Sequence, residues 1–357
     1  MSPPAAAALV VHPHLHPRRT GVTRHVETVV PLLAREGELE VTSWGKSLDP
    51  SLPRESFASL WRRLSRAPRA VWHAHRNNEL LIGLLLRLAQ QSLRVVFTRH
   101  SATRPGLWTR LLARRADRVL TLDPDSARFF EGDVRVVPHG VDTARFRPPS
   151  SPEERAHAKK ALGLDPERPV LGVIGRIRPE KGQGDLADAL SQLEPATSSP
   201  WQVVMVGRVA PEHRAFAAAL QSKLGARLRL LPERPEIEGV FRALDVLVQP
   251  SRSEGYSLVV LEAMSSGCCV VSTRDVPAAR DAIEDGRTGF LYATADVPAL
   301  TETLTRVLSA PSLISSVGAA AAKAISERHG LEQEARALSS IYRELIGREL
   351  IDRELLR

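Results

Sequence analysis

The sequence predicts an α/β protein made of two units, each with a parallel sheet covered by helices on both faces. Short runs of apolar and β-branched residues alternate with longer segments of helical spacing along the whole chain, which is typical of parallel sheets. The alternation stops at a polar, proline-rich segment near the middle and then starts again. With 357 residues, 43% of them hydrophobic and 25% charged, the chain is long enough for two ordinary domains with packed cores.

The first unit is expected to contain six strands. Segments with helical spacing lie between them, including 24–36, 77–91 and 106–116. Because helices connect the strands, the strands are expected to run parallel. The strand candidates are 7–12, 39–44, 70–75, 94–98, 118–122 and 134–138.

A linker is expected at 146–155, because "HGVDTARFRPPSSPEE" is polar, rich in proline and without periodicity. The first domain then covers 1–145 and the second 156–330, followed by a helical tail, 331–357, that we expect to pack back on the first domain. Helical spacing begins near residue 296. The strand candidates of the second domain are 169–175, 202–207, 227–231, 245–249, 269–273 and 289–292. Ligands of open parallel sheets bind beyond the carboxyl ends of the strands, so we expect the site there, in a cleft between the domains.

Positive charge is concentrated in the first half of the chain. Residues 1–150 hold 23 Lys+Arg against 13 Asp+Glu, whereas the remaining residues hold 26 against 28. A genome that favours arginine is one explanation, and an anionic partner such as a phosphorylated lipid or a membrane surface is the other. No module combining aromatic and basic residues is visible, so nucleic acid is not expected as a partner.

The cysteines and the apolar runs favour a cytoplasmic protein. Cys268 and Cys269 are the only cysteines, and adjacent residues neither staple distant segments nor have metal-ligand spacing. The N-terminus lacks the basic start and the long apolar run of a signal peptide. The most apolar later stretch, 80–89, contains Arg87 and is too short to span a bilayer.

A loop with two cations follows the strand expected at 169–175. It reads "GRIRPEKG", with Arg176 and Lys181 five residues apart beside the start of the next helix. Free N–H groups at a helix start and two basic side chains suit a diphosphate. A solvated turn with unrelated basic residues is the alternative. The loop is neither a P-loop nor a GxGxxG fingerprint, so it does not support an ATPase or a dehydrogenase.

Two carboxylates bracket seven residues in "SEGYSLVVLEAM", residues 253–264. Glu254 lies in a loop, and Glu262 lies in a helix that we expect Ser257 to cap and Gly267 to end. Ionised carboxylates accept hydrogen bonds, and each can bind two hydroxyls, such as those of a sugar or a ribose. An unrelated helix carboxylate and a surface carboxylate are the alternative.

Together these stretches resemble the donor half of glycosyltransferase family 4, the retaining transferases with the GT-B fold. The features are "GRIRPEKG" and then "QPSRSEGYSLVVLEAMSSG", with Pro-Ser, Glu-Gly, seven residues between the glutamates, and Glu-Ala-Met. "GRTGFLY" is similar to the family's following strand, and "PHGVDTARFRP" to its interdomain segment, with His139 where Asn is common. The resemblance covers 136–292 well and 1–310 loosely. It implies two Rossmann-like domains whose parallel sheets face each other across a cleft.

The resemblance also implies roles for these residues. The domain at 156–330 would bind a nucleotide-diphosphate sugar, and the domain at 1–145 the acceptor. Arg176 and Lys181 would stabilise the departing diphosphate, Glu254 would bind the sugar hydroxyls as a further catalytic residue, and Glu262 the nucleotide ribose. No metal or other cofactor is expected, because the two cations and the helix ends supply the neutralising charge. The other donor-binding positions implied are Gly175, Ser251, Gly255, Tyr256, Ser257 and Leu258.

The first half carries further matches. "RRTGVTRHV" resembles the family's glycine loop beside the donor phosphates, with Gly21 as its one glycine. His100 matches a histidine beside the reacting sugar in many members, which implies a catalytic role. "HPHLHP", residues 12–17, looks like a metal site but lacks a fourth ligand, so no metal is expected there. Candidates on the acceptor side are His73, His75 and Arg104.

A closer similarity is to the lipopolysaccharide-core mannosyltransferases of Gram-negative bacteria. It rests on "RRTGVTRHVETVVPL", "WHAHRNNELLIGLLLR" and "VVFTRHSATRPGLWTRLLARRAD", and it implies a GDP-mannose donor and an acidic, lipid-linked acceptor. A helix expected over 107–118 offers Trp108, Leu111 and Leu112 beside arginines, Arg118 among them, and could lie on the inner face of the cytoplasmic membrane. A sheet-packed helix with solvated arginines is the alternative.

The expected activity is metal-independent transfer of a hexose to a hydroxyl of a glycan or glycolipid, with anomeric retention. The best match is mannose from GDP-mannose, in the synthesis of lipopolysaccharide core or another cell-envelope glycan. No enzymic nucleophile is apparent, so the departing phosphate would assist front-face attack, by analogy with the family. The same chemistry with a UDP-sugar, an epimerase or phosphorylase on the same fold, and a catalytically inactive nucleotide-sugar scaffold stay open as alternatives.

Overall fold

The computed structural model describes residues 8–35, 39–193 and 200–355. The described chain forms two compact units. The first unit combines Met1–Gly140 with Leu331–Arg357, and the second is Val141–Gly330. The expected domains and the first expected strand also include residues outside the described ones, namely 1–7, 36–38, 194–199 and 356–357.

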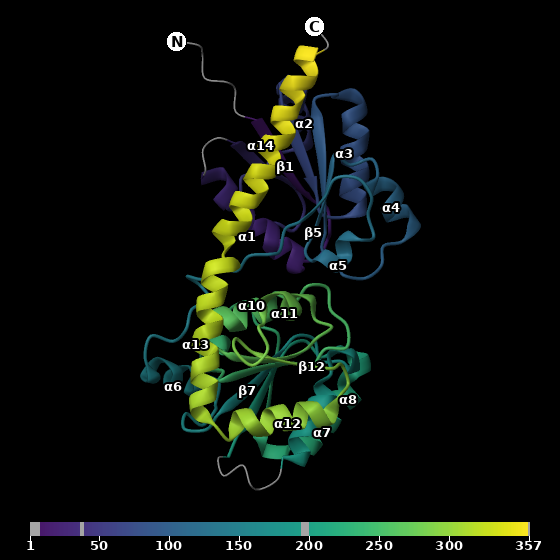
Figure 1. Cartoon of the computed structure of the whole chain (residues 1–357). Helices are drawn as coiled ribbons and strands as arrows, with labels where there is room; N and C mark the ends of the chain where they lie inside the picture. The colour runs from purple at the N-terminus through teal and green to yellow at the C-terminus, as the bar shows by residue number, and fades with distance from the viewer. Residues whose placement is uncertain (1–7, 36–38, 194–199, 356–357) are drawn as a thin grey trace. The chain divides into compact units, whose positions relative to one another are not determined.

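The first unit contains a six-stranded parallel sheet in the order β2-β1-β3-β4-β5-β6 (Figure 1). All six strands expected there are confirmed, with bounds that shift by a residue or two. The strands are β1 Ala8–His14, β2 Leu39–Gly45, β3 Ala70–Ala74, β4 Leu93–Arg99, β5 Arg118–Thr121 and β6 Val134–Val136. The helices are α1 Gly21–Arg35, α2 Phe57–Arg66, α3 Asn77–Ala89, α4 Leu107–Ala113, α5 Pro124–Ala127 and α14 Leu331–Leu355.

Successive side chains of the central strand β1 point to opposite faces of the sheet, and both faces are covered. Val10 packs in a core formed with α1 and α14. Its neighbours Leu9 and Val11 pack in a second core, with α2, α3 and α4. This is why "ALVV" in β1 is apolar throughout rather than alternating, and it identifies β1 as the interior strand that carries residues to the sheet's carboxyl edge.

The C-terminal helix α14 belongs to the core of the first unit. Tyr342 and Leu338 are buried against residues of α1 and of the central strands. Arg118 of β5 is fully buried, and its guanidinium pairs with Asp133 and, at 2.8 Å, with Glu344 of α14. A buried arginine is tolerated only when its charge is paired, so these carboxylates fix α14 on the sheet.

Helix α4 is shorter than the helix expected over 107–118. It ends at Ala113, and Asp117 then fixes the turn into β5. The Asp117 carboxylate accepts hydrogen bonds from the Val95 backbone N–H at 2.7 Å and from Arg87 at 2.9 Å. The expected helix therefore loses its last residues, because the chain must enter the sheet at that point.

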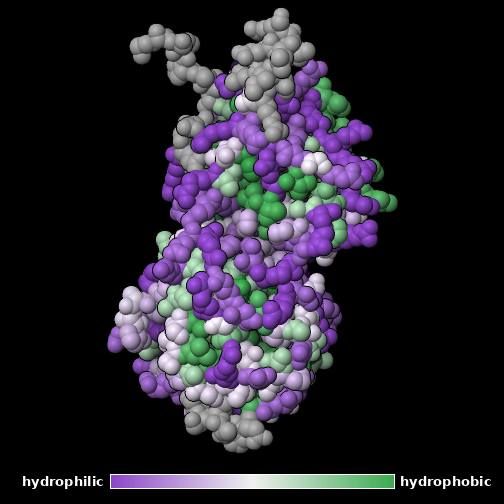
Figure 2. Space-filling view, viewed as in Figure 1, coloured by the Kyte–Doolittle hydropathy of each residue, from purple (hydrophilic) through white to green (hydrophobic). Residues whose placement is uncertain are grey.

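Helices α3 and α4 lie next to each other and expose large apolar side chains. Figure 2 shows hydrophobic side chains at the edge of the first unit where these helices lie. Leu112, one of the residues on which the membrane interpretation of this helix rested, is buried in the core. We call the exposed set the α3–α4 apolar patch; it consists of Leu85 and Leu88 on α3 and Leu107, Trp108 and Leu111 on α4.

The second unit contains a six-stranded parallel sheet in the order β12-β11-β10-β7-β8-β9. Counted from β7, this is the 3-2-1-4-5-6 order of dinucleotide-binding sheets. All six expected strands are confirmed. They are β7 Val170–Ile174, β8 Gln202–Val206, β9 Leu228–Leu231, β10 Val246–Gln249, β11 Cys269–Thr273 and β12 Phe290–Tyr292.

The helices of the second unit connect these strands, and a helix precedes the first of them. Helix α6 begins at Pro152, because the Ser151 hydroxyl accepts a hydrogen bond from the Glu154 N–H and proline suits the first helical position. The expected linker, 146–155, therefore ends at Ser151. The helices are α6 Pro152–Ala161, α7 Gln183–Gln192, α8 Arg214–Leu224, α9 Glu238–Ala243, α10 Leu258–Ser265, α11 Pro277–Ala282, α12 Val297–Leu308 and α13 Pro311–Arg328.

Within the described residues, no single helix is both long and apolar enough to cross a membrane. Helices α12 and α13 reach the required length and composition only as a pair that bends by 101°.

Candidate functional site

The loops after β7 and β10 lie at the switch point of the second sheet. Chain connections leave β7 toward β8 and β10 toward β11, in opposite directions, and this divergence opens a ligand crevice at the carboxyl ends of the strands. Gly182 has a left-handed backbone, with φ +70°, and a Cβ there would lie 1.9 Å from the carbonyl oxygen of Pro250. Glycine therefore allows the loop that carries Lys181 to lie directly against the loop that carries Glu254.

One carboxylate oxygen of Glu254 accepts hydrogen bonds from three side chains. Its Oε1 accepts hydrogen bonds from Lys181 Nζ at 2.5 Å, Gln249 Nε2 at 2.7 Å and Ser251 Oγ at 2.8 Å. The Glu254 side chain is only 10% exposed. No described residue donates to its Oε2, so this oxygen is the one left for the hydroxyl of a ligand.

Arg176 and Lys181 differ in their surroundings. Lys181 is held by Glu254, whereas Arg176 is exposed and its guanidinium makes no hydrogen bond or ion pair with a described residue. The Arg176 carbonyl accepts a hydrogen bond from the buried side chain of Gln183, the first residue of α7. No side chain caps the N-terminus of α7. Two cations and free helix N–H groups on one short segment can bind the oxygens of a diphosphate.

The loop between the two glutamates is fixed at Tyr256 and strained at Ser257. Tyr256 is buried, and its hydroxyl donates to Asp281 at 3.1 Å. Ser257 precedes α10 with φ +77°, and its side chain makes no capping hydrogen bond, so the expected cap is wrong. A left-handed residue with a side chain costs on the order of 1 kcal/mol or more and persists where the surroundings demand it. Gly255, two residues before Ser257, is half-buried.

Glu262 lies on α10, one helical turn after Leu258 and on the same side of the helix. The residue is 5% exposed, which is low for a carboxylate. The helix ends before Gly267, whose left-handed backbone confirms the expected C-terminal signal. Ser251, in the loop before the helix, is also buried and is bonded to Glu254.

In the first unit, the three predicted histidines meet at the carboxyl ends of β3 and β4. His75 Nδ1 lies 3.0 Å from His100 Nε2. His73 bonds Thr98 through Nε2 and Tyr342 through Nδ1, both at 2.6 Å. His73 and His75 are buried and bonded to their neighbours, whereas His100 is half-buried; an acceptor-side role for His73 and His75 stays a prediction.

Burial changes the protonation of these rings. It lowers the pKa of His73, His75 and His100 well below the usual histidine value, and neighbouring histidines lower each further. The three imidazoles are therefore neutral at pH 7, and each ring carries one donor and one acceptor nitrogen.

The remaining first-unit candidates are exposed. Gly21 begins α1 with open space around it, and Arg104 lies on the surface before α4. The histidines of 12–17 do not converge on one point, because His14 bonds Thr23, His16 bonds the Arg18 carbonyl and His12 bonds His75. Ligand atoms do approach within 4.8 Å in three groups of described residues: His12, His73 and His75; His25, His75 and His100; and His25, His139 and Glu334.

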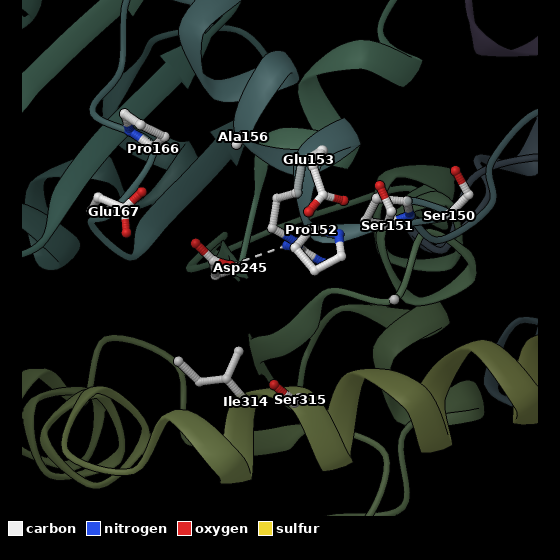
Figure 3. A pocket seen from close by; sticks show the side chains of 13 residues that line it. Ser150, Ser151, Pro152, Glu153, Ala156, Pro166, Glu167, Asp245, Ile314 and Ser315 are labelled. Atoms are coloured by element: carbon white, nitrogen blue, oxygen red, sulfur yellow. Dashed lines mark hydrogen bonds and ion pairs between the residues drawn. The ribbon is translucent and has the colours of Figure 1, made fainter.

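A pocket of about 680 Å³ on the second unit is not the predicted site (Figure 3). It lies between α6 and α13, and Asp245 at its wall comes just before β10, so the pocket sits at the amino ends of the strands. Asp245 is already bonded to Arg155, Lys159 and the Val170 N–H. Strand geometry places ligands at the opposite edge, where Lys181 and Glu254 meet.

The sequence interpretation missed several residues that hold the site. Gln249, at the end of β10, donates to both Glu254 and Ser251 and is buried. In the first unit, Glu79 accepts from the Leu15 and His75 backbone N–H groups and so joins the loops after β1 and β3. Gln249 is the first residue of the quoted stretch "QPSRSEGYSLVVLEAMSSG", and its polarity in an apolar strand was a usable signal.

Comparisons with known proteins agree with the predicted family. A family model described as glycosyl transferases group 1 matches residues 154–324. The chain is 35% identical to the lipopolysaccharide core biosynthesis mannosyltransferase LpcC of Rhizobium leguminosarum bv. viciae, over 95% of this chain and 97% of that protein. It is 34% identical to the corresponding LpsB of Rhizobium meliloti (strain 1021), over 94% of this chain and 97% of that protein.

A solved structure has the same fold. The crystal structure of Anabaena Alr3699/HepE in complex with UDP and glucose matches with a TM-score of 0.78 and 18% identity. The match covers 94% of this chain and 99% of that chain, so the likeness extends over both units.

Proposed function

The chain belongs to the family of glycosyl transferases group 1 and has the predicted α/β GT-B fold, and from this membership we propose that it moves a hexose from a nucleotide-diphosphate sugar to a hydroxyl of a glycan or glycolipid. The observation that carries the proposal is the contact of Glu254 with Lys181 and Ser251 at the switch point of the second sheet. A cation and a carboxylate held together there suit the two ends of one ligand, a phosphate and a sugar.

We propose that Arg176, Lys181 and the N-terminus of α7 bind the donor diphosphate and stabilise the charge that develops on it as the sugar leaves. The exposed, unpaired Arg176 supports this role, because its charge has no other use among the described residues. Lys181 then turns from Glu254 toward the phosphates. Glu254, still held by Gln249 and Ser251, keeps its carboxylate fixed for the sugar hydroxyls.

The reaction is proposed to proceed with retention and without a metal. Glu262 binds the nucleotide ribose, as the resemblance implies. Neither cysteine supplies a nucleophile, because burial raises the pKa of Cys268 and Cys269 to about 12. By analogy with the family, we propose that the departing phosphate assists attack of the acceptor hydroxyl from the same face, and that the two cations replace a divalent ion. Unchanged turnover in excess EDTA supports the metal-independent part, and loss of turnover contradicts it.

We propose mannose from GDP-mannose as the transferred sugar and lipopolysaccharide core or another cell-envelope glycan as the acceptor. The names of the two rhizobial relatives, which match almost the whole chain, support this choice. The acceptor of such a reaction is lipid-linked and anionic. We propose that the α3–α4 apolar patch touches the inner face of the cytoplasmic membrane, with exposed Arg115 beside it.

Turnover without acceptor tests the proposal. The protein is incubated separately with GDP-mannose, UDP-glucose and UDP-N-acetylglucosamine, and release of free sugar and nucleoside diphosphate is measured. Slow release from GDP-mannose alone is expected. Release from a UDP-sugar instead would replace the donor, and tight binding of a donor without any release would favour an inactive scaffold.

A further inference from the structure

Five histidines of the first unit form one hydrogen-bonded chain that begins at Glu334 of α14. His139 Nδ1 lies 3.0 Å from Glu334 Oε1, and His139 Nε2 lies 3.0 Å from His100 Nδ1. His100 Nε2 lies 3.0 Å from His75 Nδ1, and His75 Nε2 lies 3.2 Å from His12 Nδ1. A carboxylate on the C-terminal helix is thus joined to His100 through one intervening ring.

The chain continues through a tyrosine. His12 Nε2 lies 3.3 Å from the Tyr342 hydroxyl, which lies 2.6 Å from His73 Nδ1. His73 Nε2 ends the chain at the Thr98 hydroxyl, 2.6 Å away. In every ring, Nδ1 faces the Glu334 end and Nε2 faces the Thr98 end.

This order leaves only two arrangements of protons. A neutral imidazole donates through one nitrogen and accepts through the other, so fixing one ring fixes the next. If Glu334 accepts, every ring is the Nδ1–H tautomer. If residue 334 donates, every ring becomes the Nε2–H tautomer, and the Tyr342 hydroxyl turns around with them.

The surroundings of Glu334 favour the accepting state. Its Oε2 accepts the Gly140 backbone N–H at 2.8 Å, and its Oε1 lies 3.5 Å from His25 Nδ1 in addition to His139. The two hydrogen bonds from Gly140 and His139 stabilise an ionised carboxylate against the burial that raises the pKa of Glu334. Burial lowers the pKa of His12 and His139 to about 3, so the rings stay neutral.

We propose that Glu334 is a positioning residue that, through His139, holds His100 as its Nδ1–H tautomer, so that His100 Nε2 accepts a hydrogen bond from a hydroxyl of the sugar substrate. His100 is the half-buried ring of the chain, and His75 fills its Nε2 when no hydroxyl is bound. The part that concerns a sugar hydroxyl rests on the proposed function; the tautomer assignment does not.

Glu334→Gln tests the assignment without removing a side chain. The Gly140 N–H requires the amide oxygen on its side, so the amide nitrogen must point at His139 and donate to it. Long-range proton–nitrogen spectra of protein labelled with [15N]histidine distinguish the two tautomers directly. His139, His100, His75, His12 and His73 are expected to be Nδ1–H in the natural protein and Nε2–H in the variant. Glu332→Gln, an exposed carboxylate on the same helix, is the matched control and should change none of them.

Tyr342→Phe provides a second, independent test of the proposal. It removes the hydroxyl between His12 and His73, so adding Glu334→Gln should then reverse the four rings before the break and leave His73 unchanged. Unchanged tautomers of His139 and His100 in Glu334→Gln would overturn the proposal. So would a transition metal found bound to these nitrogens in the purified protein.

Measuring the turnover of sugar nucleotide by Glu334→Gln distinguishes failure of this proposal from failure of the proposed function. Glu334→Gln should lower kcat by roughly tenfold, since His100 Nε2 then donates where it must accept, with the donor KM nearly unchanged. Reversed tautomers with kcat unchanged would overturn the substrate role of His100. Reversed tautomers in a protein that turns over no sugar nucleotide at all would refute the transferase assignment and leave the Glu334 chain standing.

Discussion

Glu254 is the residue on which the proposed donor site depends most, because one of its oxygens binds three side chains and the other binds none of the described ones. Glu254→Gln keeps its shape but removes the charge opposite Lys181. Hydrogen bonds to a charged group contribute about 1.5–3 kcal/mol, so kcat should fall by about 10- to 150-fold while GDP still binds. Steady-state kinetics and calorimetry with GDP measure both.

The matched control for Glu254 is Glu180→Gln, an exposed carboxylate in the loop that carries Lys181. It should leave kcat within about twofold, since surface charge pairs contribute little. Full activity of Glu254→Gln would contradict the assignment of the sugar-binding carboxylate.

Gly182→Ala tests whether the two site loops must touch. The added Cβ meets the Pro250 carbonyl and a left-handed backbone, so the loop carrying Lys181 should move and GDP affinity should drop by tenfold or more. Gly184→Ala is the control, since its Cβ would lie 3.6 Å from Phe216, an ordinary contact in a helix. Equal GDP affinity in both variants would show that close contact of the loops is not needed.

The sequence singled out the charged residues of the proposed donor site but not the residues that hold them. Arg176, Lys181 and Glu254 lie in the loops after β7 and β10, where the position beyond a strand end indicates a site. Glu334 lies 195 residues from His139, and nothing local in α14 distinguishes it from the helix's other glutamates. A contact between residues so far apart in sequence can be found only in the folded structure, where α14 packs on the sheet.

At the scale of elements, the α3–α4 apolar patch supports a test of membrane contact. Trp108→Ser combined with Leu111→Ser should weaken binding to vesicles that contain anionic lipid by tenfold or more, since each buried apolar side chain contributes about 1.5–3 kcal/mol. Sedimentation with vesicles measures the bound fraction. Trp61→Ser, an exposed tryptophan on α2, is the control. Absence of vesicle binding by the natural protein would contradict the membrane proposal. Equal binding by the natural protein, the double variant and Trp61→Ser would contradict it as well.

The inner strands were predictable because they are buried on both faces and therefore read as continuous apolar runs. The bounds of the helices were harder to predict. The expected helix over 107–118 ended early because Asp117 bonds the Val95 N–H, a contact between segments far apart in sequence. The start of α6 was not predicted, because the prolines around it indicated a linker. Ser151 and Pro152 nevertheless form an ordinary helix start.

At the scale of the whole molecule, the two units should respond differently to acid. Burial lowers the pKa of His12, His25 and His139 to about 3, against about 6.5 in an unfolded chain. Between these values the unfolded chain binds protons that the folded first unit excludes, so its stability is complete above pH 6.5 and is lost as pH falls. Each histidine contributes about 1.4 kcal/mol per pH unit in that window.

Urea titrations of Trp201→Phe report on the first unit alone, since the other tryptophans all lie there. The midpoint should fall steeply between pH 6.5 and 4. A midpoint independent of pH would contradict the neutral, buried histidine chain.

The measurement that tests the central claim most directly compares GDP and GMP binding by calorimetry, in the natural protein and in Arg176→Met combined with Lys181→Met. If these cations hold the donor diphosphate, the natural protein binds GDP more tightly than GMP, by roughly tenfold or more for each cation, and the double variant loses that preference. A double variant that keeps the full preference for GDP would contradict the account.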